Sequence, residues 1–142
     1  MDNRAAEPDG YRLAVGTPDI ETYRRLRSIS GLSEKTLEAA AAGLPNTLYA
    51  VTVVWRDGAV GMGRVVGDGG CFYQITDIAV DPVHQGRGLG KQIMEALVAH
   101  LRATAPKTAY VSLIADGPAR HLYEKFGFEP TAPASIGMAL QL

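Results

Sequence analysis

The pattern of apolar positions divides the chain into a helical N-terminal part and a longer part rich in strands. A short apolar stretch, residues 11–15, predicts a first strand. Apolar residues then recur at helical spacing over residues 20–29, directly after Thr17-Pro18-Asp19, which is typical of a helix start. An alanine-rich run predicts a second helix over residues 37–42, which ends at Gly43.

From residue 48 the pattern becomes β-rich, and Asp57-Gly58 is a strong hairpin signal inside it. We therefore expect an antiparallel meander of three strands over residues 48–55, 60–66 and 71–80. Beyond the meander, the pattern predicts a helix over residues 89–103, a strand over 109–114, a short helix over 119–126 and a last strand over 136–142.

Length and composition indicate one globular domain over residues 1–142, with residues 1–10 as a flexible tail. A net charge of −1 gives no electrostatic support for a nucleic-acid partner. The polar N-terminus and the absence of a long apolar run argue against a signal peptide and a membrane span. The single cysteine, Cys71, argues against a multi-cysteine metal site. We therefore expect a cytoplasmic enzyme without a metal.

The most informative stretch joins the predicted strand at residues 71–80 to the predicted helix at residues 89–103. It contains Gly86, Gly88 and Gly90, which let the backbone bend sharply just before the predicted helix. Such a turn presents free backbone N–H groups at the N-terminus of the helix, and these form a site suited to a phosphate. The spacing fits neither a Walker A loop, which needs Ser or Thr after the lysine, nor the dinucleotide fingerprint G-x-G-x-x-G.

Two blocks of sequence point to one family. Gln85-x-x-Gly88-x-Gly90, preceded by D-I-A-V-D-P, resembles the acetyl-coenzyme A motif (Q/R)-x-x-G-x-(G/A) of the GCN5-related N-acetyltransferase (GNAT) superfamily. Residues 119–128 resemble the superfamily's A-x-x-L-Y-x-K-x-G-F signature. The resemblance covers residues 48–142 and implies an α/β (α+β) GNAT fold. That fold has a central mixed, mostly antiparallel sheet of six to seven strands, flanked by about four helices. Strands four and five are splayed around acetyl-coenzyme A.

The same resemblance implies how acetyl-coenzyme A binds as the acetyl donor. The pantetheine would pair with the strand backbone at residues 78–80, and the pyrophosphate would lie on the N–H groups of residues 85–90. Members often carry asparagine seven residues before the tyrosine; here that residue is Asp116, which we expect to cap the following helix. The predicted coenzyme-binding residues are Ile78, Ala79, Val80, Gln85, Gly86, Arg87, Gly88, Leu89, Gly90, Lys91, Asp116, Ala119, Tyr123 and Lys125.

Members transfer the acetyl group directly to a primary amine in a ternary complex. The family position makes Tyr123 the candidate general acid for the leaving thiolate. Asp77, next to the coenzyme strand, is the leading candidate base, although a solvent-facing or hairpin-pairing role is an equal alternative. His84 and His121 are weaker candidates, and no Ser-His-Asp or Cys-His arrangement points to a covalent intermediate.

The acceptor is less constrained, and its candidate binding residues are Arg27, Tyr49, Tyr73 and Asp77. Residues 76–91 are also similar to the corresponding stretch of glucosamine-6-phosphate acetyltransferases. Because no extended charged face is evident, we expect a small amine: an amino acid, aralkylamine, polyamine or amino sugar. A protein lysine or protein N-terminus is the alternative acceptor, and a non-catalytic coenzyme A-binding sensor is a second alternative. A homodimer is compatible with the sequence, and neither nucleic acid nor membrane is expected as a partner.

Overall fold

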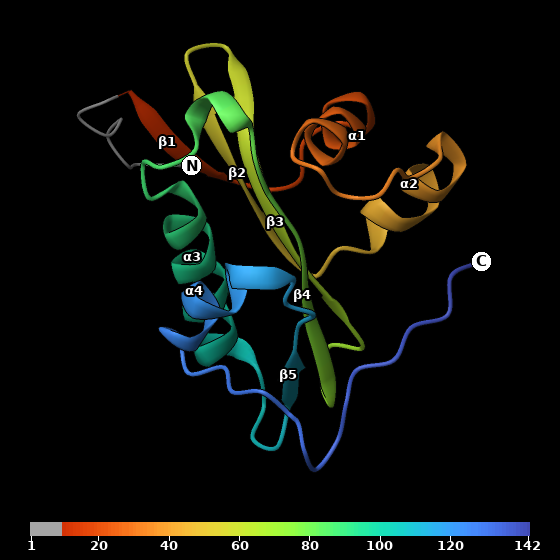
Figure 1. Ribbon diagram of the computed structural model, residues 1–142. Coiled ribbons are helices and arrows are strands. Elements are labelled where there is room, and N and C mark those ends of the chain that lie inside the picture. Colours follow the sequence, from red (N-terminus) through yellow and green to blue (C-terminus); the bar gives the residue numbers. More distant parts are fainter. Residues whose placement is uncertain (1–9) are drawn as a thin grey trace.

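The computed structural model describes residues 10–142 and contains a five-stranded sheet with helices on both faces (Figure 1). The strands follow one another across the sheet in chain order, antiparallel except for the parallel last pair. This confirms the predicted mixed, mostly antiparallel sheet. The strands are β1 (Tyr11–Val15), β2 (Tyr49–Trp55), β3 (Gly58–Gly67), β4 (Phe72–Val80) and β5 (Tyr110–Ser112).

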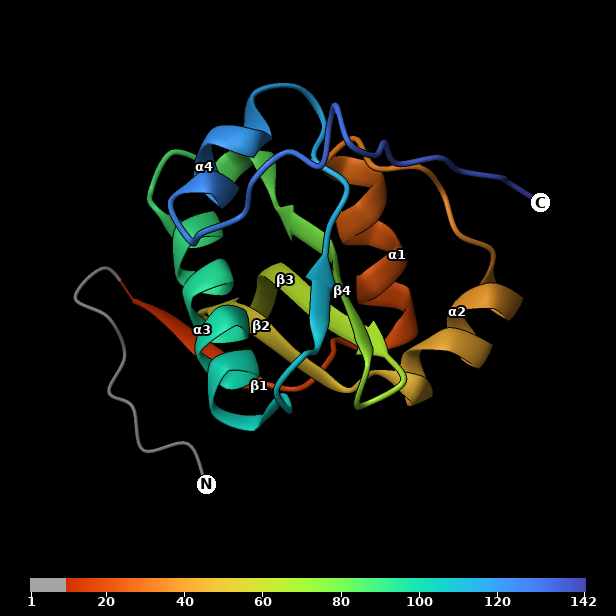
Figure 2. The same cartoon turned by 90° about the horizontal axis from the view of Figure 1, so that it is seen from below.

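In residues 10–142 four α-helices flank the sheet, as expected from the sequence. α1 and α2 cover one face, whereas α3 and α4 lie on the other side (Figure 2). Polar side chains cap the first two helices: Asp19 Oδ1 accepts the Thr22 N–H at 2.8 Å, and Thr36 Oγ1 accepts the Ala39 N–H at 3.0 Å. The helices are α1 (Ile20–Ile29), α2 (Leu37–Gly43), α3 (Leu89–Thr104) and α4 (Arg120–Glu124).

Two apolar layers hold the helices to the sheet. The layer under α3 joins its Ile93 and Leu97 to valines of β2 and β3, and all of these side chains are buried. The layer under α1 and α2 is smaller and centres on Leu26 and Met62. Burying one such side chain is worth roughly 1.5–3 kcal/mol, so the α3 layer contributes most to the sheet's stability.

The predicted last strand over residues 136–142 is wrong, and the described residues form a sheet of five strands instead of six to seven. Ile136, Met138 and Leu140 are exposed, and this segment runs away from β5 toward α2 (Figure 1). A segment of alternating apolar residues forms a strand only where a neighbouring strand hydrogen-bonds to its backbone. In the described residues β5 pairs with β4 alone, so residues 136–142 have no partner strand there. The predicted tail falls mainly on residues 1–9, which lie outside the described residues. None of the helices in the described part is long and apolar enough to cross a membrane.

Candidate active site

The site forms where β4 and β5 separate. The two strands pair only at Phe72 to Gln74, opposite residues 110–112. Beyond this point β4 continues to Val80, while the chain after β5 leads toward α4. A cavity of 480 Å³ opens between them. The sequence therefore predicted the splayed strands correctly, and the cavity lies at the predicted place.

The walls of this cavity come from five parts of the chain, one of which is α1 with Arg27. β4 contributes residues 74–78. The side toward α4 is formed by Leu113, Ile114, Asp116, Ala119 and Tyr123. The loop between α1 and α2, residues 31–33, and Gln141 near the C-terminus complete the lining. The predicted residues that the structure brings together here are Arg27, Asp77, Ile78, Asp116, Ala119 and Tyr123.

A β-bulge at Asp77 determines which way this residue points. Asp77 has a φ of +59°, in the left-handed region, and the β3–β4 register shifts opposite it, between Met62 and Arg64. Such a bulge reverses the alternation of side chains along the strand. Tyr73 and Ile75 consequently belong to the α3 layer, whereas Asp77 projects toward α1.

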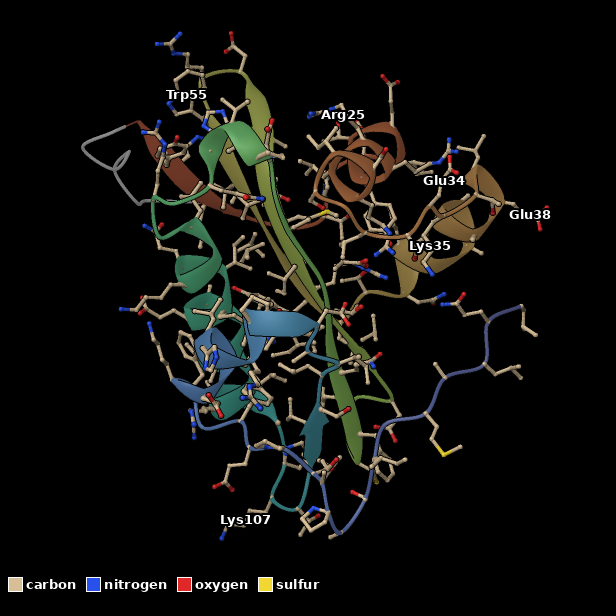
Figure 3. The ribbon with its side chains drawn as sticks, viewed as in Figure 1. Arg25, Glu34, Lys35, Glu38, Trp55 and Lys107 are labelled. Carbon is tan, nitrogen blue, oxygen red and sulfur yellow. The ribbon has the colours of Figure 1, made fainter. Side chains whose placement is uncertain are left out.

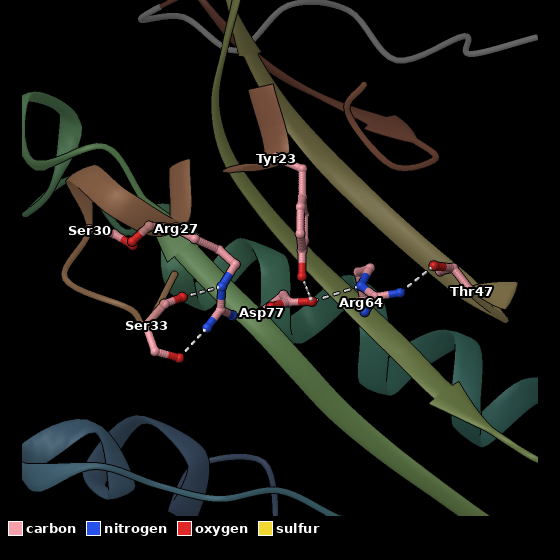
Figure 4. Close-up of polar contacts among 7 residues, drawn as sticks. All are labelled: Tyr23, Arg27, Ser30, Ser33, Thr47, Arg64 and Asp77. Atoms are coloured by element: carbon pink, nitrogen blue, oxygen red, sulfur yellow. Dashed lines mark hydrogen bonds and ion pairs between the residues drawn. The ribbon is translucent and has the colours of Figure 1, made fainter. Parts of the chain in front are cut away.

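The carboxylate of Asp77 is buried and holds together three elements (Figure 4). Arg27 Nη1 of α1 donates to Oδ1, and the two form an ion pair. Arg64 Nε of β3 donates to Oδ2 at 2.8 Å, and the Tyr23 hydroxyl donates to the same oxygen at 2.9 Å. Three of the roughly four lone-pair positions of the carboxylate are therefore occupied. Asp77 thus has a structural role, and its burial contradicts the solvent-facing alternative.

The two arginines extend this cluster to neighbouring segments. Arg27 donates from Nε to the Ser33 carbonyl at 2.8 Å and from Nη2 to the Ser33 hydroxyl at 3.0 Å, which fixes the loop over the cavity. Arg64 Nη1 donates to Thr47 Oγ1 at 2.6 Å. Burial, followed by the negative charge of Asp77, raises the pKa of Tyr23, so this hydroxyl stays a donor at neutral pH. Sequence reasoning missed Tyr23 and Arg64 because only the bulge turns Asp77 toward them. It also missed Ser33, which contacts Arg27 and not Asp77.

Tyr123 lines the cavity from α4 and is half-buried. Burial raises the pKa of its phenol, and the nearby negative charge of Asp116 raises it further. The phenol therefore keeps its proton at neutral pH, as a general acid must. Asp116 itself is exposed, and its side chain does not cap the turn Gly117–Ala119 that precedes α4; the predicted cap is wrong. The turn Gly117–Ala119 is closed instead by the backbone, because the Asp116 carbonyl accepts the Ala119 N–H.

The glycine-rich loop presents free backbone donors where α3 begins. Gly86 and Gly88 both have a φ of +79°, a conformation that glycine adopts without strain. Within the described residues, no backbone N–H from Gly86 to Lys91 donates a hydrogen bond. Free N–H groups at a helix N-terminus form a site for a phosphate, and the exposed Arg87 and Lys91 add positive charge. These residues fit the pyrophosphate of a nucleotide coenzyme.

Two side chains hold this loop in place. Gln85 Nε2 donates to the Val80 carbonyl at 2.9 Å, which ties the loop to the end of β4. His84 is buried, with Nδ1 2.6 Å from the Tyr11 hydroxyl and its ring against Tyr11 and Trp55. His84 therefore anchors the loop from beneath and has no access to the cavity.

Three predicted residues lie away from the cavity. The Tyr49 ring stacks on His100 of α3 with centroids 3.7 Å apart, and Tyr73 is buried in the α3 layer. Both side chains project from the sheet face that α3 covers, so the structure contradicts their predicted contact with the acceptor. Lys125 lies exposed at the end of α4 and does not line the cavity.

A family model described as an acetyltransferase (GNAT) domain matches residues 47–130, which include β4, the glycine-rich loop and α4. The chain belongs to the GNAT family. The match covers most of the cavity lining but not α1, which supplies Arg27. The family match therefore includes β4, the glycine-rich loop and α4, and it begins after α1 and α2.

Solved structures and curated proteins agree with this assignment. A structure from meticillin-resistant Staphylococcus aureus, described as a protein of unknown function and probable acetyltransferase, is 47% identical, with a TM-score of 0.89 over 93% of this chain and 99% of that one. Histone acetyltransferase TAP1 of Glycine max is 34% identical over 93% of this chain and 63% of its own length. Serotonin N-acetyltransferase 2, chloroplastic, of Oryza sativa subsp. japonica is 36% identical over 56% of this chain and 39% of its own length. This chain thus spans less than two thirds of the length of these curated relatives.

Proposed function

We propose that this GNAT domain transfers an acetyl group from acetyl-coenzyme A to the primary amine of a small molecule. The observation that carries the proposal is the separation of β4 from β5, because it opens a cavity that contains Tyr123. The free N–H groups of residues 86–91 follow β4 in the chain. The proposed phosphate site and the cavity therefore lie along the same strand and the loop after it.

The coenzyme supplies the acetyl group as a thioester, which is already activated for attack by an amine. The β4 backbone at residues 78–80, which lacks a β5 partner, would pair with the amides of the pantetheine. Residues 86–91 would hold the pyrophosphate. A backbone N–H of Ala79 or Val80 would donate to the carbonyl oxygen as it becomes negative. Tyr123 would donate its phenolic proton to the departing thiolate. The raised pKa of the phenol keeps this proton on Tyr123 at neutral pH.

The surroundings of the cavity favour a small acceptor over a peptide. The loop at residues 31–33 and Gln141 line it, so a bound acceptor is enclosed by chain on several sides. The outer side of α1, α2 and the loop between them carries both signs of charge, with Arg25, Glu34, Lys35 and Glu38 all exposed (Figure 3). A basic peptide binds best to a continuous acidic surface, and this mixed surface does not provide one.

The test is a thiol-release assay with acetyl-coenzyme A and a panel of acceptors. The panel contains amino acids, serotonin, a polyamine, glucosamine 6-phosphate, a lysine-containing histone peptide and a peptide with a free N-terminus. We expect thiol release with one class of small amine, and a product heavier by one acetyl group in mass spectrometry. Peptides that outcompete every free amine would favour a protein acetyltransferase, as the name of the Glycine max relative suggests for that protein. Tight coenzyme binding without release would favour a sensor.

A further inference from the structure

The cavity contains two carboxylates in different surroundings, and we propose that Asp116 is the one that binds the acceptor's ammonium group and accepts its proton. This assignment rests on the proposed transfer to an amine. It gives the base role to the residue between β5 and α4 and leaves Asp77 as the residue that positions the arginines.

Asp77 is poorly suited to a proton-transfer role because its hydrogen-bonding capacity is already used. Its two oxygens accept three donors, and the side chain is only 3% exposed. Two of these donors are guanidinium groups that cannot give up a proton. Asp77 is already the ion-pair partner of both Arg27 and Arg64, so little of its carboxylate is left for an acceptor.

The carboxylate of Asp116 has the opposite character. It is exposed, it lines the same cavity as Tyr123, and in the described part of the chain no hydrogen-bond donor reaches it. Only its backbone carbonyl is engaged, by the Ala119 N–H at 3.2 Å. Asp116 is also close enough to Tyr123 for its charge to act on the phenol. A free carboxylate beside the candidate general acid is where an acceptor amine has to lie.

The charges around the cavity favour an ammonium group at Asp116. The titratable groups in the lining are Arg27, Asp77, Asp116 and Tyr123. Arg27 is paired with Asp77, and Arg64 of β3 contacts Asp77 from outside the lining. Asp116 is therefore the negative charge in this lining that no cation offsets. Arg120, the first residue of α4, lines a neighbouring cavity that shares Leu113 and Tyr123 with this one.

The proposed step balances with the groups named. The ammonium group gives one proton to Asp116, directly or through one water, and its nitrogen gains a free lone pair. This lone pair forms the bond to the thioester carbonyl carbon, and the carbon–sulfur bond then breaks. The thiolate takes the proton of Tyr123, and the nitrogen gives its second proton back to the phenolate. The proton on Asp116 leaves to solvent, so the products are an amide, a free thiol and one proton.

The experiment compares wild type with Asp116→Asn, which keeps the shape and removes the charge. Each enzyme is assayed with an alkylamine found active in the panel, and with a fluorinated analogue of that amine whose nitrogen is unprotonated at neutral pH. We expect Asp116→Asn to lower kcat/KM for the alkylamine by about 10²-fold at pH 7 and to recover as the pH rises toward the amine's own pKa of ~10. The fluorinated amine needs no base, so we expect the two enzymes to use it nearly equally.

Two further variants and one binding measurement make the result specific. Glu124→Gln removes a carboxylate from α4 that lies outside the cavity, and we expect wild-type kinetics from it. Asp116→Glu keeps the carboxylate, and we expect it to restore a large part of the activity. Two results would overturn this assignment and leave the proposed function standing. In one, wild type is active and Asp116→Asn has the same kcat/KM; in the other, Asp116→Asn differs from wild type only in its affinity for the coenzyme. A wild type that binds acetyl-coenzyme A but acetylates no amine would overturn the proposed function and this assignment with it.

Discussion

Replacement of Asp77 by asparagine removes the only negative charge that Arg27 and Arg64 contact in the described residues. The two arginine side chains are 8% and 11% exposed, so water cannot replace the lost partner. The asparagine NH₂ group would face a guanidinium group in at least one orientation, which adds a second unfavourable contact. We therefore expect this variant to fold with much lower stability or not at all.

The size of the effect follows from the burial of the pair. Removing one partner of a buried ion pair costs about 3–5 kcal/mol, because the remaining charges stay buried without compensation. For a domain of this size, 1 kcal/mol corresponds to roughly 3–4 °C in Tm, so we expect Tm to fall by about 10 °C or more. Asp116→Asn changes an exposed carboxylate without a partner, and its effect should stay within about 0.5 kcal/mol.

The assay is urea unfolding followed by circular dichroism, with wild type, Asp77→Asn and Asp116→Asn measured side by side. The midpoint of Asp77→Asn should shift strongly while its m-value stays that of wild type. Equal midpoints for the two variants would refute the reasoning, because Asp77 would then contribute no more than a surface carboxylate. A large loss for Asp116→Asn would contradict the structure at that residue.

Three further changes test other parts of the structure. Burial, followed by the charge of Asp77, raises the pKa of Tyr23 above its ordinary value of 10.0. The stabilisation linked to this shift is fully present below pH 10 and is lost as the pH rises further, so the free energy of unfolding falls in alkali. Tyr23→Phe should flatten this alkaline decline in urea titrations at several pH values. In Gly63→Ala the new Cβ would lie 2.5 Å from Ile93 Cγ2, so we expect a loss of about 1–3 kcal/mol, and a wild-type Tm would contradict the packing. Gly88→Ala meets no atom within 4 Å but strains a φ of +79°, so calorimetry should show weaker acetyl-coenzyme A binding with little change in Tm.

Local sequence signals predicted most of the fold because each acts over a few residues. Asp19 and Thr36 cap the helices that follow them, and the Asp57-Gly58 hairpin joins β2 to β3. The glycine-rich loop likewise lies at the start of α3, as the helical pattern directly after the glycines predicted. These features depend on backbone geometry and near neighbours, so a pattern in the chain is sufficient to predict them.

The parts that sequence reasoning missed depend on contacts between distant segments. The bulge at Asp77 reverses the strand's alternation, and no local pattern announces the Arg27 and Arg64 contacts, which lie 50 and 13 residues away in sequence. Tyr49 and Tyr73 are acceptor candidates because they lie in or near segments that build the acceptor site in this superfamily. The sheet face they occupy depends on which side α3 packs. The segment at residues 136–142 alternates as a strand does but has no partner edge.

The measurement that tests the central claim most directly is the rate of thiol release by Tyr123→Phe, compared with wild type at saturating acetyl-coenzyme A and acceptor. Phenylalanine keeps the ring that α4 packs into the cavity and removes only the proton donor. The account predicts that kcat falls by about 10²-fold while coenzyme affinity and Tm remain close to wild type. An undiminished kcat in a correctly folded variant would contradict the claim that the chemistry takes place at Tyr123 in this cavity.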